Sequence, residues 1–131
     1  MKTIRVLVVD SDPTSRALHR SVLEALAPEL SLSFVTTYDA ISGARIFEGL
    51  DRFDLLITGG LFRAGPTGVE FAKALRAQQA DLGVIFLSTD TGCVGAAAAA
   101  GFAAMKKPYD QDRFVAVVRE LLAQKPQPAK V

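Results

Sequence analysis

The sequence predicts an α/β domain built on a doubly wound parallel sheet. Short apolar runs rich in β-branched residues, typical of strands covered on both faces, alternate with stretches whose apolar residues recur at helical spacing. Five such runs and five such stretches follow one another along the 131 residues. This alternation implies right-handed crossovers with helices on both faces of the sheet, and it places any site at the carboxyl ends of the strands.

Five short segments are expected to form the strands. Residues 4–9 are almost continuously apolar, and Leu32, Phe34 and Thr36 alternate along a second strand. The segments 54–58, 84–88 and 103–107 supply the other three. The helical patterns lie in the connections between these segments.

Capping residues mark the start of the first two helices. Asp12 followed by Pro13 predicts an N-cap and first turn, and this helix is expected to end before Pro28. Asp39 predicts the N-cap of the second helix. The inward stripe of the first helix is expected to consist of Leu18, Val22, Ala25 and Leu26.

Three further helices are predicted in the second half of the chain. A glycine-rich loop at residues 59–68 leads to the third, with Phe71, Ala72 and Leu75 facing inward. The alanine run at 96–100 predicts a short fourth helix. The apolar stripe of the last helix consists of Phe114, Val117, Val118, Leu121 and Leu122.

Composition and charge argue against several classes of protein. Lys and Arg number 15 against 14 Asp and Glu, so no charge imbalance points to nucleic acid or to an anionic membrane surface. The N-terminus lacks a signal-peptide pattern, and no apolar stretch has the length of a membrane span. Cys93 is the only cysteine, which excludes an internal disulfide and fits a reducing compartment. We therefore expect a cytoplasmic location, and a protein partner or small ligand.

The length of the chain fits one domain with one hydrophobic core. We expect this domain to occupy residues 1–123. Residues 124–131 are polar and are interrupted by Pro126 and Pro128, so they are expected to form a flexible tail or the stub of a linker.

Polar residues that could carry chemistry follow four of the predicted strands. Each has a plain structural explanation when taken alone, as a helix cap, a strand end or a solvated lysine. Their common position at the carboxyl ends of strands is harder to explain that way, and we expect them to converge on one shallow cleft. They are Asp10, Ser11, Asp12, Thr58, Gly59, Ser88 and Lys107.

Four segments carry a specific resemblance to a known family. They are residues 6–16 (VLVVDSDPTSR), 53–57 (FDLLI), 84–88 (VIFLS) and 107–109 (KPY). Together they resemble the receiver domain of response regulators in two-component signalling, over essentially the whole chain up to about Leu122. The resemblance implies a flavodoxin-like, CheY-like sheet of strand order 2-1-3-4-5 with five helices.

The resemblance also implies a set of site residues. In that family two adjacent acids after the first strand hold Mg²⁺, and an aspartate at the end of the third strand accepts a phosphoryl group from a histidine kinase. A serine or threonine and a lysine contact the phosphoryl oxygens, which are the roles implied for Ser88 and Lys107. The bond between Lys107 and Pro108 is expected to be cis, as is typical of the family.

The sequence departs from the family pattern at linked positions. Ser11 stands where the second metal-binding acid is expected, while Asp10 matches the first and Asp12 is better explained as a helix cap. Counted forward from Asp54, the acceptor position falls on Gly59. Counted back from Gly68, across a loop longer than is usual in the family, it falls on Gly60. No Asp or Glu occurs between residues 54 and 70, so no small shift of register supplies an acceptor. The aromatic residue that the family places before its Lys-Pro pair is replaced by Ala104.

These departures have physical consequences for the cleft. Mg²⁺ prefers several carboxylate or phosphate oxygens, so with Asp10 as the one plausible ligand we expect its binding to be weak or absent. We expect Lys107 to pair with Asp10 instead. Thr58 is a poor substitute acceptor because a threonine needs an adjacent base, and the sole histidine, His19, lies on the first helix.

Three functions are weighed. The first is a pseudo-receiver, neither an enzyme nor a cofactor-binding protein, that contacts a signalling or regulatory protein without phosphorylation and could form a homodimer. The second is a phosphorelay receiver that uses Asp10 or Asp12 as acceptor. The third is a binder of small anions that uses the loop Gly59–Gly68 as a cradle, although this loop matches neither phosphate-binding fingerprint and its glycines are more simply turn residues.

Overall fold

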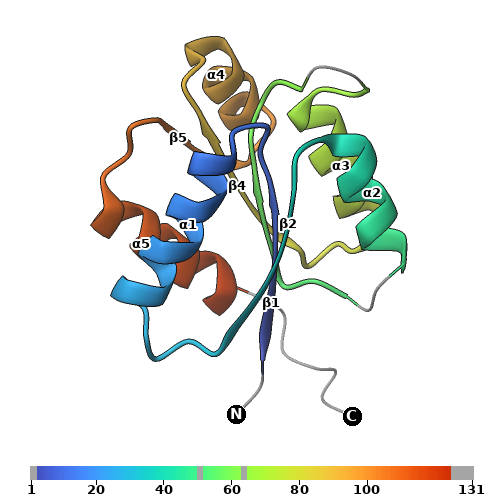
Figure 1. Ribbon diagram of the computed structural model, residues 1–131. Helices are drawn as coiled ribbons and strands as arrows, with labels where there is room; N and C mark the ends of the chain where they lie inside the picture. Colours follow the sequence, from blue (N-terminus) through green and yellow to red (C-terminus); the bar gives the residue numbers. More distant parts are fainter. Residues whose placement is uncertain (1–2, 50–51, 63–64, 125–131) are drawn as a thin grey trace.

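The computed structural model describes residues 3–49, 52–62 and 65–124. Within this part of the chain five strands alternate with five helices (Figure 1). The strands are β1 (Ile4–Val9), β2 (Leu32–Thr37), β3 (Leu55–Thr58), β4 (Gly83–Ser88) and β5 (Ala103–Lys106). The helices are α1 (Pro13–Leu26), α2 (Ala40–Gly49), α3 (Gly68–Gln78), α4 (Thr91–Ala99) and α5 (Gln111–Ala123).

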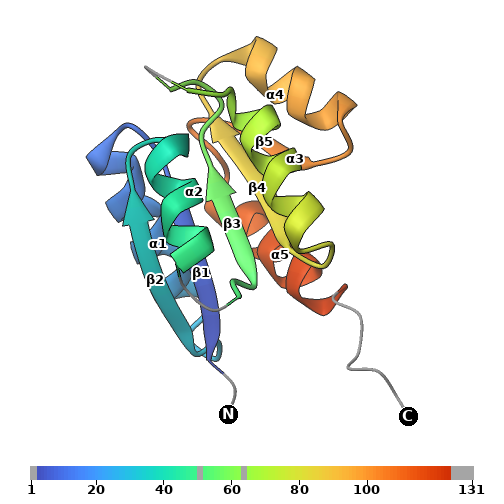
Figure 2. The ribbon, with the colours of Figure 1, turned by 90° about the vertical axis from the view of Figure 1, so that its right-hand side faces the viewer.

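All the strands run parallel in one sheet of order β2-β1-β3-β4-β5, so the predicted fold class and strand order are confirmed. Figure 2 shows this order across the sheet, with α2 and α3 in front and α1 and α5 behind. β1 lies between β2 and β3, and Val6 to Val9 pair on both sides. The carboxyl ends of β1, β3, β4 and β5 therefore meet at one edge.

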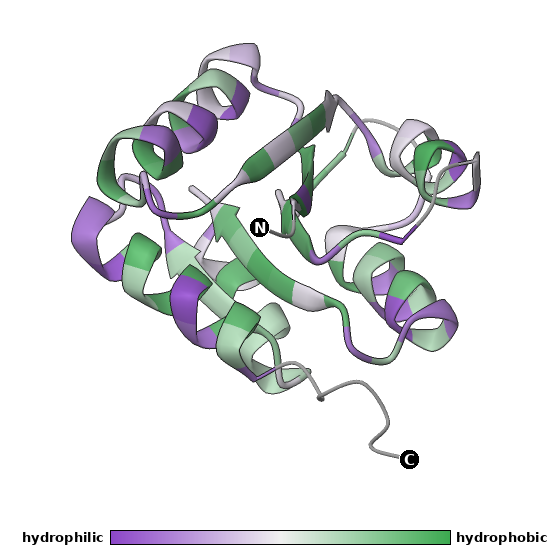
Figure 3. Cartoon of the chain, turned by 90° about the horizontal axis from the view of Figure 1, so that it is seen from below, coloured by the Kyte–Doolittle hydropathy of each residue, from purple (hydrophilic) through white to green (hydrophobic). Residues whose placement is uncertain are grey.

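The sheet divides the core into two layers because successive strand residues point to opposite faces. Val6 and Val8 pack with buried residues of α1 and α5, whereas Leu7 and Val9 pack with those of α2, α3 and α4. Figure 3 shows strands coloured mainly as hydrophobic, between helices that carry both hydrophilic and hydrophobic stretches. This burial on both faces explains why β1, β3 and β4 read as continuous apolar runs.

The inward face of α1 differs from the prediction. Of the four residues expected there only Val22 is buried; Leu18 and Leu26 are 43% and 38% exposed, and Ala25 is exposed too. The buried residues are instead Ser15, His19, Val22 and Leu23. α1 therefore turns a different face toward the sheet from the one expected. Ser15 and His19 lie on this face, where they contact Lys107 and Tyr109.

The other helices follow the prediction more closely. Phe71, Ala72 and Leu75 are buried on α3, as expected. The fourth helix is longer than the alanine run predicts, because Asp90 accepts from the Cys93 amide at 2.9 Å and the helix begins at Thr91, ahead of the alanine run. α5 ends at Ala123, and residues 125–131, for which a tail or linker is expected, lie outside the described residues.

Candidate functional site

A hollow of about 260 Å³ lies at the carboxyl edge of the sheet. Six of the seven expected site residues line it, namely Asp10, Ser11, Asp12, Gly59, Ser88 and Lys107. Thr58 does not line it. As the last residue of a fully buried strand it is 1% exposed, and its hydroxyl donates to the carbonyl of Gly59 at 2.9 Å.

Asp10 and Lys107, which both line the hollow, form an ion pair, as the sequence predicts. Lys107 Nζ lies 2.7 Å from Asp10 Oδ2 and also donates to Ser15 Oγ at 3.0 Å. The side chains are largely buried, with 17% of Lys107 and 6% of Asp10 exposed. The peptide bond between Lys107 and Pro108 is cis, as expected.

Asp10 is held on several sides. Its Oδ1 accepts from the Asp12 amide at 2.9 Å, and the Nε2 atom of His19 lies 3.6 Å from its Oδ2. Burial alone would raise the pKa of the Asp10 carboxyl, but His19, Lys107 and the Asp12 amide together hold that pKa below its ordinary value. Asp10 is therefore a carboxylate whose charge is neutralised inside the protein.

His19 is a member of this network that sequence reasoning missed. It is 1% exposed, and its Nδ1 lies 2.8 Å from the hydroxyl of Tyr109. Nε2 has no hydrogen-bond partner among the described residues. Burial raises the pKa of Tyr109 to about 12, so the phenol stays protonated at neutral pH. The signal available in the sequence was the spacing of Ser15, His19, Val22 and Leu23, which places them on one helical face.

Asp12 acts as the cap of α1. Its Oδ1 accepts from the Thr14 amide at 3.0 Å, and its Oδ2 accepts from the Ser15 hydroxyl at 3.0 Å. Ser11, between the two aspartates, is exposed. Asp10 is therefore bound to a lysine, whereas Asp12 and Asp90, which also lines the hollow, cap the first turns of α1 and α4.

Packing distinguishes the two glycines that compete for the acceptor position. A Cβ atom on Gly59 would lie 3.8 Å from the carboxyl carbon and from Oδ2 of Asp10, which is ordinary contact distance. A Cβ on Gly60 would lie only 2.5 Å from Cβ and 2.9 Å from Sγ of Cys93. Gly59 is therefore the position from which a side chain would face Asp10, and nothing in the backbone requires a glycine there.

Ser88 lies across the hollow from Asp10. Its hydroxyl accepts from the Asp90 amide at 3.1 Å. β5 continues past its last residue through a bond from the Lys107 amide to the Ser88 carbonyl at 2.8 Å. This bond fixes Ser88 and Lys107 beside each other at the strand ends.

Backbone amides at both ends of the loop between β3 and α3 are bonded within the protein. The Gly59 amide donates to Val9 at 2.8 Å, and the Gly68 amide donates to Gly60 at 3.0 Å. Thr67 and Glu70 form a reciprocal capping box at the start of α3, with bonds of 2.9 and 3.2 Å, which places a carboxylate at that helix end. These bonds and the Glu70 carboxylate argue against an anion cradle at the two ends of the loop; residues 63 and 64 lie outside the described residues.

No protein-family model and no curated protein matches the chain. Solved structures match it across nearly their whole length. A response regulator receiver protein from Sinorhizobium medicae gives a TM-score of 0.81 at 15% identity, covering 94% of this chain and 97% of that one. A CheY-like receiver domain protein from Methanospirillum hungatei gives 0.75 at 17%, covering 94% and 96%.

The fold is that of the response regulator receiver domains. Another protein with this receiver fold is the response regulator TrrA from Thermotoga maritima, solved in complex with Mg²⁺-BeF. Its TM-score is 0.73 at 24% identity, and the match covers 91% of this chain and 99% of that one. The likeness, at identities of 15–24% for these three proteins, is one of fold.

Among the described residues, no helix is both long and apolar enough to cross a membrane. No group of three or more His, Cys, Asp or Glu side chains in the same part of the chain is arranged to hold a metal ion.

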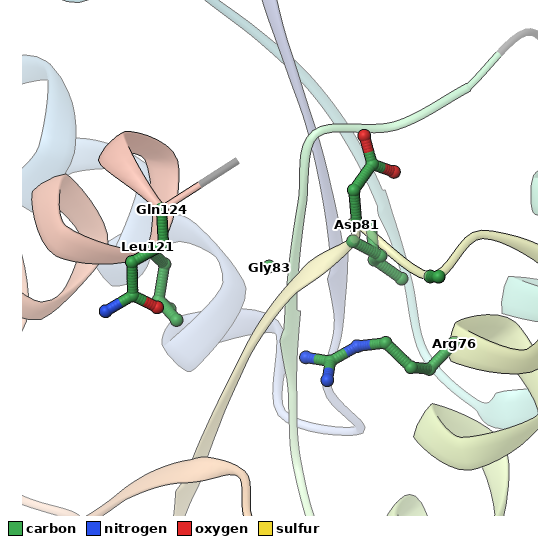
Figure 4. A pocket seen from close by; sticks show the side chains of 7 residues that line it. Arg76, Asp81, Gly83, Leu121 and Gln124 are labelled. Carbon is green, nitrogen blue, oxygen red and sulfur yellow. The ribbon is translucent and has the colours of Figure 1, made fainter. Parts of the chain in front are cut away.

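A separate hollow of about 260 Å³ lies at the opposite, amino-terminal edge of the sheet (Figure 4). Figure 4 shows the side chain of Arg76 reaching toward Gly83, with Leu121 and Gln124 on the other side. The Arg76 guanidinium packs over the ring of Phe102 at 5.2 Å. This hollow lies at the far end of β4 from Ser88, and so it is distinct from the cleft of the receiver fold.

Proposed function

We propose that this chain is a pseudo-receiver, a signalling module that takes no phosphoryl group and acts through contacts with a signalling or regulatory protein. One observation carries the proposal. The position that faces Asp10 at the end of β3 is Gly59, while Asp10 itself is bonded to Lys107 at 2.7 Å. The lysine that would contact phosphoryl oxygens in a receiver already has an internal anion.

Asp10 and Asp12 are poor substitutes for the missing acceptor. Asp10 is 4% exposed and bonded to Lys107 and to the Asp12 amide. Asp12 holds the first turn of α1 through two hydrogen bonds. Phosphorylation of either would break these contacts, and attack by a carboxylate needs its oxygen free to approach the phosphorus. These contacts argue against a phosphorelay receiver that uses Asp10 or Asp12.

The donor set does not fit Mg²⁺, which requires near-octahedral oxygen ligands at about 2.0–2.1 Å. Asp10 directs one oxygen at Lys107 and the other at the Asp12 amide. Ser11 offers only a neutral hydroxyl, and Gly59 offers no side chain at all. A cation would have to displace an ammonium group that is already bonded, so we propose that the cleft works without metal.

Intact-mass spectrometry tests the proposal. The purified chain is incubated with acetyl phosphate and Mg²⁺ at neutral pH and its mass is measured before and after. We expect no species heavier by one phosphoryl group, because Asp10 is buried in its ion pair and the carboxylates of Asp12 and Asp90 are engaged as helix caps. A stoichiometric gain in mass would contradict the proposal, and peptide mapping would then show whether Asp10 or Asp12 carries the group.

A further inference from the structure

A groove lies beside the cleft, on the side away from Lys107. It has a volume of about 840 Å³ and runs between the connections that follow β1, β2 and β3. Its apolar wall consists of Pro13, Tyr38, Leu61 and Phe62. The Phe62 ring packs edge-on against the buried Phe71, with centroids 6.5 Å apart. This contact holds the Phe62 side chain in place in the groove.

The apolar side chains here are unusually exposed. Tyr38 and Leu61, which both line the groove, are 59% and 58% exposed. They are the two most exposed of the five exposed large hydrophobic residues in the described part of the chain. Surface residues of this kind are unremarkable singly, but two of them on one groove mark a contact surface.

The rim of the groove is acidic. Asp12 and Asp39 line it from two different connections, and Ser11 and Asp12 line both the groove and the cleft. Asp39 accepts from the Ser42 amide at 2.8 Å through Oδ1, as Asp12 does from Thr14, so both carboxylates are fixed in place as helix caps. No lysine or arginine lines the groove among the described residues; Arg63, which follows Phe62 in the sequence, lies outside them.

We propose that this groove docks a protein segment that presents a bulky apolar side chain next to a lysine or arginine. The apolar side chain inserts between Tyr38 and Leu61, and the cation lies against Asp12 and Asp39. A phosphate-bearing ligand is excluded by the same two carboxylates. This inference deepens the proposed function, since it names the surface and the partner chemistry of an interaction module.

A phage-displayed library of random twelve-residue peptides, selected on the immobilised wild-type chain, provides the probe. We expect the enriched peptides to combine Phe, Trp or Leu with an adjacent Lys or Arg. The synthetic peptide should bind roughly tenfold more weakly to Leu61→Ser, since the apolar contact is lost. Binding to Asp39→Asn, which keeps a good helix cap, should weaken severalfold and depend less on salt, since Asp12 alone then faces the cation.

Leu18→Ser is the matched control, since Leu18 is exposed to a similar degree but lies on α1 outside the groove. Its affinity for the peptide should equal that of the wild type, and urea unfolding should show that all three variants are folded. The inference is overturned if no peptide is enriched, if the enriched peptides lack the basic and apolar pair, or if Leu61→Ser binds as well as the wild type.

The outcomes also separate this inference from the function on which it rests. Peptides that bind Leu61→Ser as tightly as the wild type would show that the groove is not the docking site. The proposal that the chain is an interaction module would still stand. Self-association through this face, seen as a dimer in sedimentation that Leu61→Ser abolishes, would overturn the inference in favour of a second copy of the chain. A phosphorylated aspartate in the mass measurement would contradict the proposed function whatever the groove binds.

Discussion

Replacing Lys107 with methionine should lower the free energy of unfolding at pH 7 by about 2–4 kcal/mol. The variant leaves the buried Asp10 carboxylate without its cation, and breaking a buried ion pair from one side is among the costlier substitutions. The cost stays in the lower part of the range for such pairs because 17% of the lysine side chain is exposed to water. Urea unfolding followed by circular dichroism measures the change.

Two further variants identify the cause. The double variant Asp10→Asn with Lys107→Met should be more stable than Lys107→Met alone, because the unpaired charge is gone. Lys106→Met, at the exposed neighbouring position, should stay within about 0.5 kcal/mol of the wild type. A Lys107→Met variant as stable as Lys106→Met would show that the ion pair does not hold the cleft together.

Gly68→Ala should destabilise the domain by about 2 kcal/mol or more, as expected for an overpacked site that cannot relax. The added Cβ would lie 2.3 Å from the carbonyl oxygen of Gly59 and 3.0 Å from Cα of Gly60. Relief would require the two backbone segments to separate, and the bond of 3.0 Å between the Gly68 amide and the Gly60 carbonyl joins them. Thermal and urea unfolding both report the loss.

Gly59→Ala is the matched comparison on the same loop. Its Cβ meets nothing closer than 3.8 Å, so the variant should lie within about 1 kcal/mol of the wild type and could gain stability through a less flexible unfolded chain. If Gly59→Ala were as damaging as Gly68→Ala, the glycine at the acceptor position would be required by packing. Its presence would then carry no information about function.

The sheet could be predicted from the sequence because its signals are local. Strands buried on both faces must be apolar throughout, as residues 6–9 and 84–87 are, and Asp12 and Asp39 mark helix starts by the caps they form. The pairing of Asp10 with Lys107 was also predictable. Parallel strands bring their carboxyl ends together, and these were the charged residues of opposite sign placed there.

The errors arose where polar side chains are buried. The apolar spacing of α1 favoured Leu18, Ala25 and Leu26 as the inward face, yet the helix buries Ser15 and His19. Their partners, Lys107 and Tyr109, are about 90 residues away in the sequence, so no local pattern reveals them. The sequence also left open whether Gly59 or Gly60 stands at the acceptor position. Cys93 leaves no room for a side chain on Gly60, and this contact cannot be deduced from the length of the loop.

The most direct test of a phosphorylation-independent cleft is the ¹H–¹⁵N correlation spectrum of the chain, recorded while Mg²⁺ and beryllofluoride are added. TrrA from Thermotoga maritima, solved with Mg²⁺-BeF, serves as the positive control. We expect the amide signals of Gly59, Gly60, Ser88 and Lys107 to stay in place, because Asp10 is already bonded to Lys107 and no carboxylate extends from residue 59. Saturable shifts of these four signals would show that the cleft still accepts a metal and a phosphoryl mimic, and would contradict the proposed function.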